Sequence, residues 1–144
     1  MNADALQHLS RADKTLARLI EKVGPCTLKP GARRTPFAAL VHAITHQQLN
    51  GTAAQTILKR VLALYPAKRF PTPEDLLNTP DTSLRGAGLS RAKTAAVKDL
   101  AAKTITGVVP PARAVAKMSD DELVERLTTV RGVGMPASAR RKDV

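Results

Sequence analysis

The stretch Leu-Thr-Thr-Val-Arg-Gly-Val-Gly at residues 127–134 decides how we expect this chain to fold. Gly132 and Gly134 are expected to end one helix and lead into the next. Backbone N–H groups at such a junction have no intrahelical carbonyl to bond, and the positive end of the second helix lies beside them. Glycines let a phosphate approach these donors, so the stretch predicts a phosphate site with Arg131 next to it. The pattern alone leaves open an ordinary glycine stop at the end of a helix.

Helical patterns fill the chain before this stretch. Ser119 and Glu122 have the spacing of a capping box, which predicts a helix leading into residues 127–134. Apolar residues at helical spacing predict one amphipathic helix from Leu6 to Val23. Further helices are expected at 36–44 after Thr35, at 54–65 after Asn50-Gly51, in a short segment capped by Thr72, at 81–85, and after Ser90; residues 27–34 read as a loop. No strand alternation of convincing length occurs, so the predicted fold class is all-α.

The composition indicates a polyanionic partner. Lys and Arg number 23 against 12 Asp and Glu in 144 residues, which gives a formal net charge of +11. Cys26 is the only cysteine, which excludes an internal disulfide and all-cysteine metal sites. No apolar run approaches the ~20 residues of a membrane span, and the first residues lack a signal-peptide pattern, so we expect a cytoplasmic protein with no membrane partner.

Three segments, in order, resemble the helix-hairpin-helix DNA glycosylases, in particular the 3-methyladenine DNA glycosylase II branch. Residues 36–50, PFAALVHAITHQQLN, are similar to the helix and corner that begin the central domain of this family. Residues 88–101, which start Gly-Leu-Ser-Arg-Ala-Lys, are similar to its middle segment, and residues 127–134 to the first half of its hairpin. The likeness covers residues 3–134.

This resemblance implies that the chain binds double-stranded DNA, flips out a damaged base and hydrolyses its N-glycosidic bond. In that case Gln48 fills the gap that the base leaves, and Gln47 lies beside the base pocket. A polar helix end is the alternative interpretation for both glutamines. The backbone of Gly132, Val133 and Gly134 would hold a phosphate, in relatives often with a sodium or potassium ion.

Further candidates carry less specific signals. Ser90, Arg91 and Lys93 are candidate phosphate contacts, although a solvated helix start explains them equally well. His42 and His46 lie four residues apart, as in a metal pair, but no third ligand follows at a recognisable spacing. We therefore predict no side-chain metal site and no cofactor beyond the possible monovalent cation at Gly132 and Gly134.

The sequence departs from the family after Gly134. Residues 135–144, MPASARRKDV, form a short basic tail where the family has a long helix and, about twenty residues on, a catalytic aspartate. Asp143 lies too close to the hairpin to match that aspartate, and Lys142 does not match the lysine of the lyase branch. We therefore expect a glycosylase-like domain at 1–134, a divergent tail at 135–144 that looks like a truncation, and an exposed core surface that favours a homodimer.

Three functions are compatible with these patterns. The first is a base-excision repair N-glycosylase for alkylated purines, with catalysis uncertain because the aspartate is not found. The second is a non-catalytic DNA-binding module. The third is a basic helical protein that binds RNA or another protein.

Overall fold

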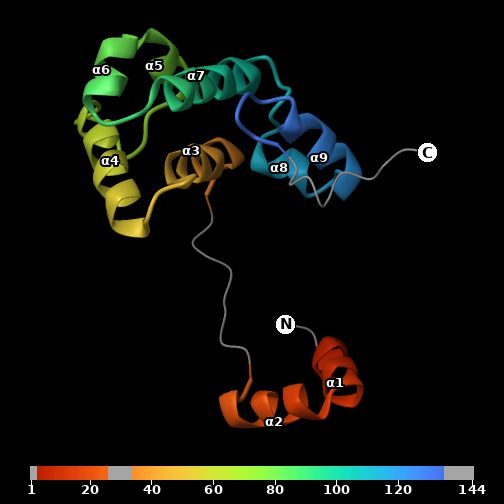
Figure 1. The fold of residues 1–144 in the computed structure, drawn as a ribbon. Coiled ribbons are helices and arrows are strands. Elements are labelled where there is room, and N and C mark those ends of the chain that lie inside the picture. Colours follow the sequence, from red (N-terminus) through yellow and green to blue (C-terminus); the bar gives the residue numbers. More distant parts are fainter. Residues whose placement is uncertain (1–2, 26–33, 135–144) are drawn as a thin grey trace. The chain divides into compact units, whose positions relative to one another are not determined.

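A computed structural model of the chain describes residues 3–25 and 34–134, and the regular structure of these residues is entirely helical (Figure 1). The helices are α1 (Ala3–Ala12), α2 (Lys14–Val23), α3 (Pro36–His46), α4 (Gly51–Ala63), α5 (Pro73–Asn78), α6 (Asp81–Gly86), α7 (Arg91–Ile105), α8 (Ala112–Val115) and α9 (Asp120–Thr128). The predicted all-α fold class is thereby confirmed. In the described ranges, no helix combines the length and apolar character that a membrane span requires.

Internal contacts divide the chain into two compact units, residues 1–33 and 34–144, a boundary that the sequence did not indicate. In the first unit α1 packs against α2, and neither helix has a buried residue. The sequence predicted one continuous helix here, which is wrong. Asp13 adopts an extended backbone and its carboxylate accepts the N–H groups of Thr15 and Leu16 at 2.7 and 3.4 Å. This N-cap ends α1 and starts α2.

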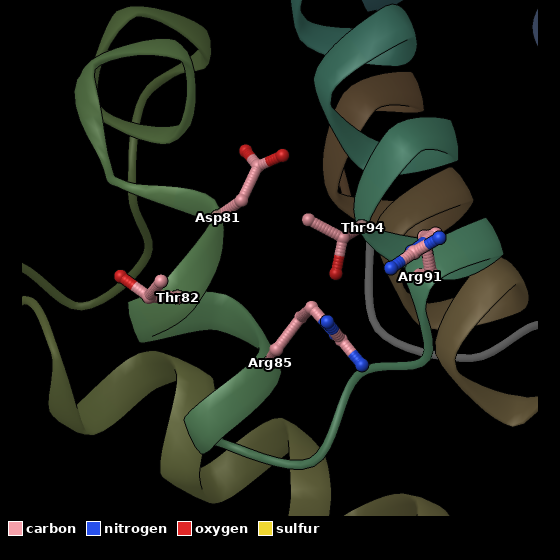
Figure 2. Close-up of a pocket in the computed structure, with 5 residues that line it drawn as sticks. All are labelled: Asp81, Thr82, Arg85, Arg91 and Thr94. Carbon is pink, nitrogen blue, oxygen red and sulfur yellow. The ribbon is translucent and has the colours of Figure 1, made fainter.

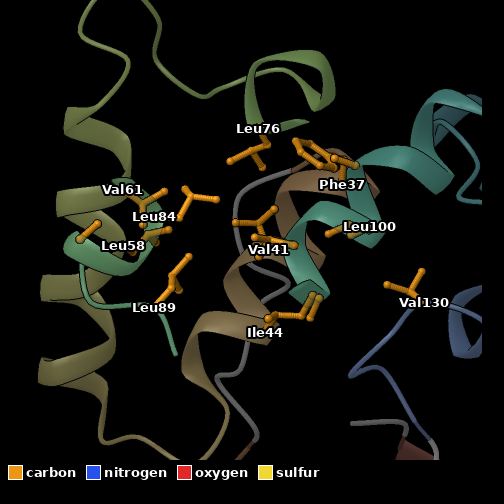
Figure 3. Packing of buried hydrophobic residues seen from close by; sticks show 14 of the residues in the cluster. Phe37, Val41, Ile44, Leu58, Val61, Leu76, Leu84, Leu89, Leu100 and Val130 are labelled. Atoms are coloured by element: carbon orange, nitrogen blue, oxygen red, sulfur yellow. The ribbon is translucent and has the colours of Figure 1, made fainter. Parts of the chain in front are cut away.

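The second unit is organised around α7. This helix packs against α3, α5 and α6, and α3 also packs against α4. The core that they enclose consists mainly of Leu, Val and Ala with one buried aromatic side chain, Phe37 (Figure 3). The buried aliphatic residues of α7 are Ala96, Val97, Leu100 and Ala101. Small side chains on this helix allow its neighbours to approach closely, as the buried Ala96 and Ala101 illustrate.

Most helix starts lie where the sequence predicted them. Side chains of Thr35, Thr72, Ser90 and Ser119, where the sequence predicted helix starts, accept a backbone N–H three positions on. Asn50 does the same for α4, a cap that the sequence analysis did not predict. At Ser119 only half of the predicted capping box forms, because the carboxylate of Glu122 accepts Arg126 Nη2 at 3.1 Å instead. The sequence did not predict α8.

Some predictions lie outside the described residues. These are the loop at 27–34 apart from Arg34, the tail at 135–144, and Cys26. The predicted homodimer also stays a prediction.

Candidate nucleic-acid interface

A tight corner joins α3 to α4 at residues 46–50. The N–H of Leu49 donates to the carbonyl of His46 at 3.3 Å, and Asn50 caps α4 by accepting Ala53 N–H at 2.8 Å. Between them Gln48 has φ +57° and is the only non-glycine residue with a positive φ in the described ranges. Its side chain is exposed and has no partner in that part of the chain. A bulky residue in the left-handed region is uncommon, so the corner holds Gln48 outward at some cost in strain.

Lys93 holds this corner from α7. Its ammonium donates to the carbonyls of Thr45 and Gln47, each at 2.8 Å, where the last turn of α3 has no intrahelical donors left. Burial lowers the pKa of the Lys93 ammonium. Lys93 was a candidate phosphate contact, and the structure directs its charge to the corner instead. Ser90, another such candidate, accepts the Lys93 N–H at 3.1 Å as the N-cap of α7.

The predicted hairpin turn at residues 130–134 is held by α7 as well. Val130 is buried, and the Arg131 N–H donates to Asp99 Oδ2 at 2.7 Å. The Val133 N–H closes the turn on the carbonyl of Val130 at 3.0 Å. Of the three backbone N–H groups predicted to meet a phosphate, those of Gly132 and Gly134 therefore remain without a partner in the described part of the chain.

Asp99 on α7 supports the turn, and the sequence analysis did not identify it. Besides the Arg131 N–H, its carboxylate accepts Lys103 Nζ at 2.8 Å, and that ammonium also donates to the carbonyl of Thr129 at 2.5 Å. Burial raises the pKa of Asp99, but the hydrogen bonds from Lys103 and the Arg131 N–H, with their charges, outweigh it and lower the pKa overall. The i, i+4 spacing of Asp99 and Lys103 was visible in the sequence, but the contact to Arg131 was not.

Two features of the turn favour glycine at position 132. Its φ is +80°, and a Cβ built on it would lie 3.2 Å from Cβ of Ala96 on α7. The turn therefore packs with its backbone directly on the helix. The carbonyl of Gly132 also accepts Gln47 Nε2 at 2.9 Å, which joins the turn to the corner across 85 positions of sequence.

One face of α7 thus positions both loops. Lys93, Ala96, Asp99 and Lys103 follow one another at spacings of three and four, which places them on the same side of the helix. The N-terminal part of this face contacts the corner and the C-terminal part contacts the turn. Between the two loops the Gln47 bond closes a ring of contacts.

The predicted cation at the turn stays a prediction. The Gly132 carbonyl already accepts Gln47, but a carbonyl oxygen keeps a second lone pair with which it can ligate sodium or potassium. The residues of the turn therefore fit such an ion without requiring it.

His42 and His46 belong to a hollow beside the corner. Their rings stack at 6.0 Å, and His46 Nδ1 lies 2.8 Å from the carbonyl of His42. Burial lowers the pKa of His42, as do the nearby Arg34 and His46. The hollow has a volume of about 330 Å³ and is lined by Arg34, His42, His46, Gln55, Leu58, Lys59 and Leu62, with no carboxylate. Among the described residues no three potential ligands gather as a metal site would need.

Residues 41–143 match the family described as HhH-GPD superfamily base excision DNA repair protein. This match contains both loops and α7, and it also runs through most of the segment 135–144. The chain is 32% identical over 130 residues to alkylbase DNA glycosidase-like protein mag2 of Schizosaccharomyces pombe. That alignment covers 90% of this chain and 61% of the relative. The chain thus spans less than two thirds of the relative's length.

Solved structures show the same likeness. The 3-methyladenine DNA glycosylase of Schizosaccharomyces pombe in complex with abasic DNA superposes with a TM-score of 0.81 at 32% identity, over 92% of this chain and 65% of that one. A DNA-3-methyladenine glycosidase from Bacillus halodurans gives a TM-score of 0.69 at 29% identity, over 88% and 56%. By its corner, its hairpin turn and these matches, the chain belongs to the HhH-GPD superfamily of base excision DNA repair proteins.

Proposed function

We propose that this chain works in DNA base excision repair, where it binds duplex DNA at an alkylated purine, stabilises the flipped-out base and takes part in hydrolysis of its N-glycosidic bond. The observation that carries the proposal is the hydrogen bond from Gln47 to Gly132. It places the corner, with its outward Gln48, next to the turn, whose Gly132 and Gly134 N–H groups have no partner among the residues that the structure describes.

The two loops divide the work of binding. The N–H groups of Gly132 and Gly134 suit a phosphate of the DNA backbone, because charged acceptors bond strongly to free backbone donors. Gln48 suits the gap that opens when a base leaves the stack. Flipping costs a few kcal/mol, least for a damaged base, and a side chain that fills the gap offsets part of this cost. A relative solved with abasic DNA supports this assignment.

A second candidate function is duplex binding without hydrolysis. Glycosidic cleavage develops positive charge on the sugar and requires a carboxylate to stabilise it. The carboxylate that contacts the turn, Asp99, already accepts two donors, and the hollow beside the corner is lined by none. These observations favour the second candidate for the described residues.

Release of free base separates the two candidates. Duplexes containing 3-methyladenine or 7-methylguanine are incubated with the chain and with the Gln48→Ala variant. Base release above the level of the variant supports hydrolysis. No release, together with intact duplex binding, contradicts the hydrolytic proposal and leaves the binding module.

Duplex binding is measured in parallel over a salt series. We expect the logarithm of the affinity to fall with a slope near −0.9 per phosphate contacted. Gly134→Pro removes a backbone N–H, whereas Gly134→Ala keeps it, so the proline variant is expected to bind about tenfold more weakly than the alanine variant. A chain that shows no salt-sensitive duplex binding contradicts both candidates.

A further inference from the structure

A pocket separate from the corner and the turn lies between α6 and the first turn of α7 (Figure 2). Its volume is about 490 Å³, many times the roughly 30 Å³ of a water molecule in the liquid. It is lined by Asp81, Thr82, Arg85, Arg91 and Thr94. The turn that connects α6 to α7 packs closely on α4, because Gly88 has φ +115° and a Cβ on it would lie 2.9 Å from Cγ1 of Ile57.

The hydroxyl of Thr94 is buried in this pocket without a partner. Thr94 is 2% exposed, and its Oγ1 is the only buried side-chain polar atom in the described residues that lacks a hydrogen bond. Thr45 and Thr104, also within helices, donate to the carbonyl four residues earlier at 2.8 and 2.7 Å. Buried hydroxyl groups are normally paired. The exception at Thr94 therefore indicates that a ligand in the pocket accepts a hydrogen bond from this hydroxyl.

The charged groups at the pocket that have no ion-pair partner among the described residues are positive. Arg85 and Arg91 are exposed and form no ion pair or hydrogen bond in the part of the chain that the structure describes. Asp81 is paired with Lys98 at 2.6 Å, and its carboxylate points away from both guanidinium groups (Figure 2). The N-terminus of α7, where Arg91 is the first residue, adds the positive end of a 15-residue helix.

We propose that this pocket binds a phosphate group, held by the guanidinium groups of Arg85 and Arg91 and by the hydroxyl of Thr94. Planar guanidinium groups recognise phosphate through paired N–H donors, and two of them on different helices suit one anion between them. The proposal deepens the proposed function if the phosphate belongs to duplex DNA. In that case the first turn of α7, which positions the corner through Lys93, is itself anchored to the DNA backbone.

The phosphate has two possible sources, a DNA strand or a free phosphate compound, and the experiment has an arm for each. In the first arm, ¹H–¹⁵N NMR follows the full chain during titration with inorganic phosphate and with dimethyl phosphate. We expect saturable shifts at the backbone N–H of Arg91 and Thr94 and at the Arg85 side chain. The Arg85→Gln, Arg91→Gln double variant is expected to lose them. A matched control, Arg60→Gln with Arg113→Gln, removes the same charge outside the pocket and is expected to keep them.

Thr94→Val distinguishes a ligand contact from a structural role. The valine keeps the shape and removes the unpaired hydroxyl, so the melting temperature is expected to stay the same or rise while phosphate binds at least threefold more weakly. Shifts that are equal in the pocket variant and the control variant would overturn the proposal, and so would unchanged phosphate affinity in Thr94→Val.

In the second arm, duplex binding is measured over a salt series. If the phosphate is that of DNA, the pocket variant shows a slope smaller by about 0.9 than the control variant. Equal slopes with phosphate still bound in the pocket assign the site to a free phosphate compound. If the chain does not bind duplex at all but phosphate still saturates the pocket, the proposed function fails while this inference stands.

Discussion

The corner at residues 46–50 and the turn at residues 130–134 are held by the same helix, α7, with opposite charges. At the corner a cation, Lys93, binds carbonyl groups, so the backbone is occupied, while the Gln48 side chain has no partner in the described part of the chain. At the turn an anion, Asp99, binds the Arg131 N–H group, and the N–H groups of Gly132 and Gly134 have no partner within residues 3–25 and 34–134. The corner therefore presents a side chain, whereas the turn presents its backbone.

The largest effect on stability and duplex affinity is expected from Gly132→Ala, which distorts the turn. Alanine at φ +80° costs about 1–2 kcal/mol, and its Cβ would press on Ala96 at 3.2 Å. We expect the free energy of unfolding, from urea denaturation, to fall by about 2 kcal/mol, and duplex affinity to fall tenfold or more. Gly134→Ala is the control, because nothing lies within 4 Å of its Cβ. Equal losses of unfolding free energy in the two variants would refute the close packing of the turn on α7.

Asp99→Asn tests the anion that holds the turn. Hydrogen bonds to charged groups contribute about 1 kcal/mol more than neutral ones, and Asp99 accepts two, so the variant should lose about 2 kcal/mol of unfolding free energy at neutral pH. Duplex affinity should fall with it, since the turn loses its anchor. A stable variant with unchanged duplex affinity would show that Asp99 does not position the turn. Asp75→Asn is the control, because Asp75 pairs with Lys68 away from both loops.

The same carboxylate predicts a pH dependence. The pKa of Asp99 in the folded chain lies below its unfolded value of about 4. Its stabilising contribution is therefore fully present above about pH 4 and is lost as the pH falls through the folded pKa. The difference in unfolding free energy between the natural chain and Asp99→Asn should shrink below pH 4 in urea titrations. A difference that stays constant down to pH 2 would contradict this sign.

A smaller effect is expected at the corner from Lys93→Met. The variant loses two hydrogen bonds to carbonyls, but it also avoids burying an ammonium whose pKa is lowered by burial. We expect a net loss of about 1 kcal/mol in unfolding free energy and a weaker preference for damaged duplex. Lys117→Met on the surface is the matched control. If salt-dependent duplex binding is lost and the NMR signals of the corner do not change, Lys93 contacts a DNA phosphate and does not hold the corner.

Substitution of Gln48 should change the free energy of unfolding least, and its glycine and alanine variants should differ in that change. Gln48→Gly relieves the left-handed backbone, and the greater freedom of unfolded glycine offsets part of this gain, so stability should rise by about 0.5 kcal/mol. Gln48→Ala keeps the strain. Both variants should lose the preference for damaged duplex, as measured by fluorescence anisotropy. A glycine variant that is less stable than the alanine variant would refute the strain at the corner.

Local signals made the helices of the second unit predictable. A capping side chain and its partner N–H lie three residues apart, so the helix starts after Thr35, Thr72, Ser90 and Ser119 could be predicted from the sequence. The break at Asp13 was missed because the apolar spacing continues across it on both sides. The carboxylate of such an aspartate can accept the backbone N–H groups of the next residues, which competes with a continuous helix. The regular apolar spacing on both sides makes this signal hard to recognise in the sequence.

The contacts of the site were less predictable. Its loops were found from residues 46–50 and 130–134, but their supports depend on packing over long separations. Arg131 and Asp99 are 32 residues apart, and Lys93 lies 46 residues from the Gln47 carbonyl that it binds. A lysine near a helix start reads as a solvent-exposed cation until tertiary structure turns it inward. The direction of Lys93 and the role of Asp99 therefore required the folded chain.

One comparison of affinities tests whether the corner recognises damage through a side chain and the turn binds DNA through its backbone. Abasic and intact duplexes of the same sequence are titrated with the natural chain, Gln48→Ala and Gly132→Ala. We expect Gln48→Ala to abolish the preference for the abasic duplex and to keep the affinity for the intact one. We expect Gly132→Ala to weaken binding to both duplexes by the same factor. Equal losses on both duplexes in Gln48→Ala, or a loss confined to the abasic duplex in Gly132→Ala, would contradict these roles of the corner and the turn.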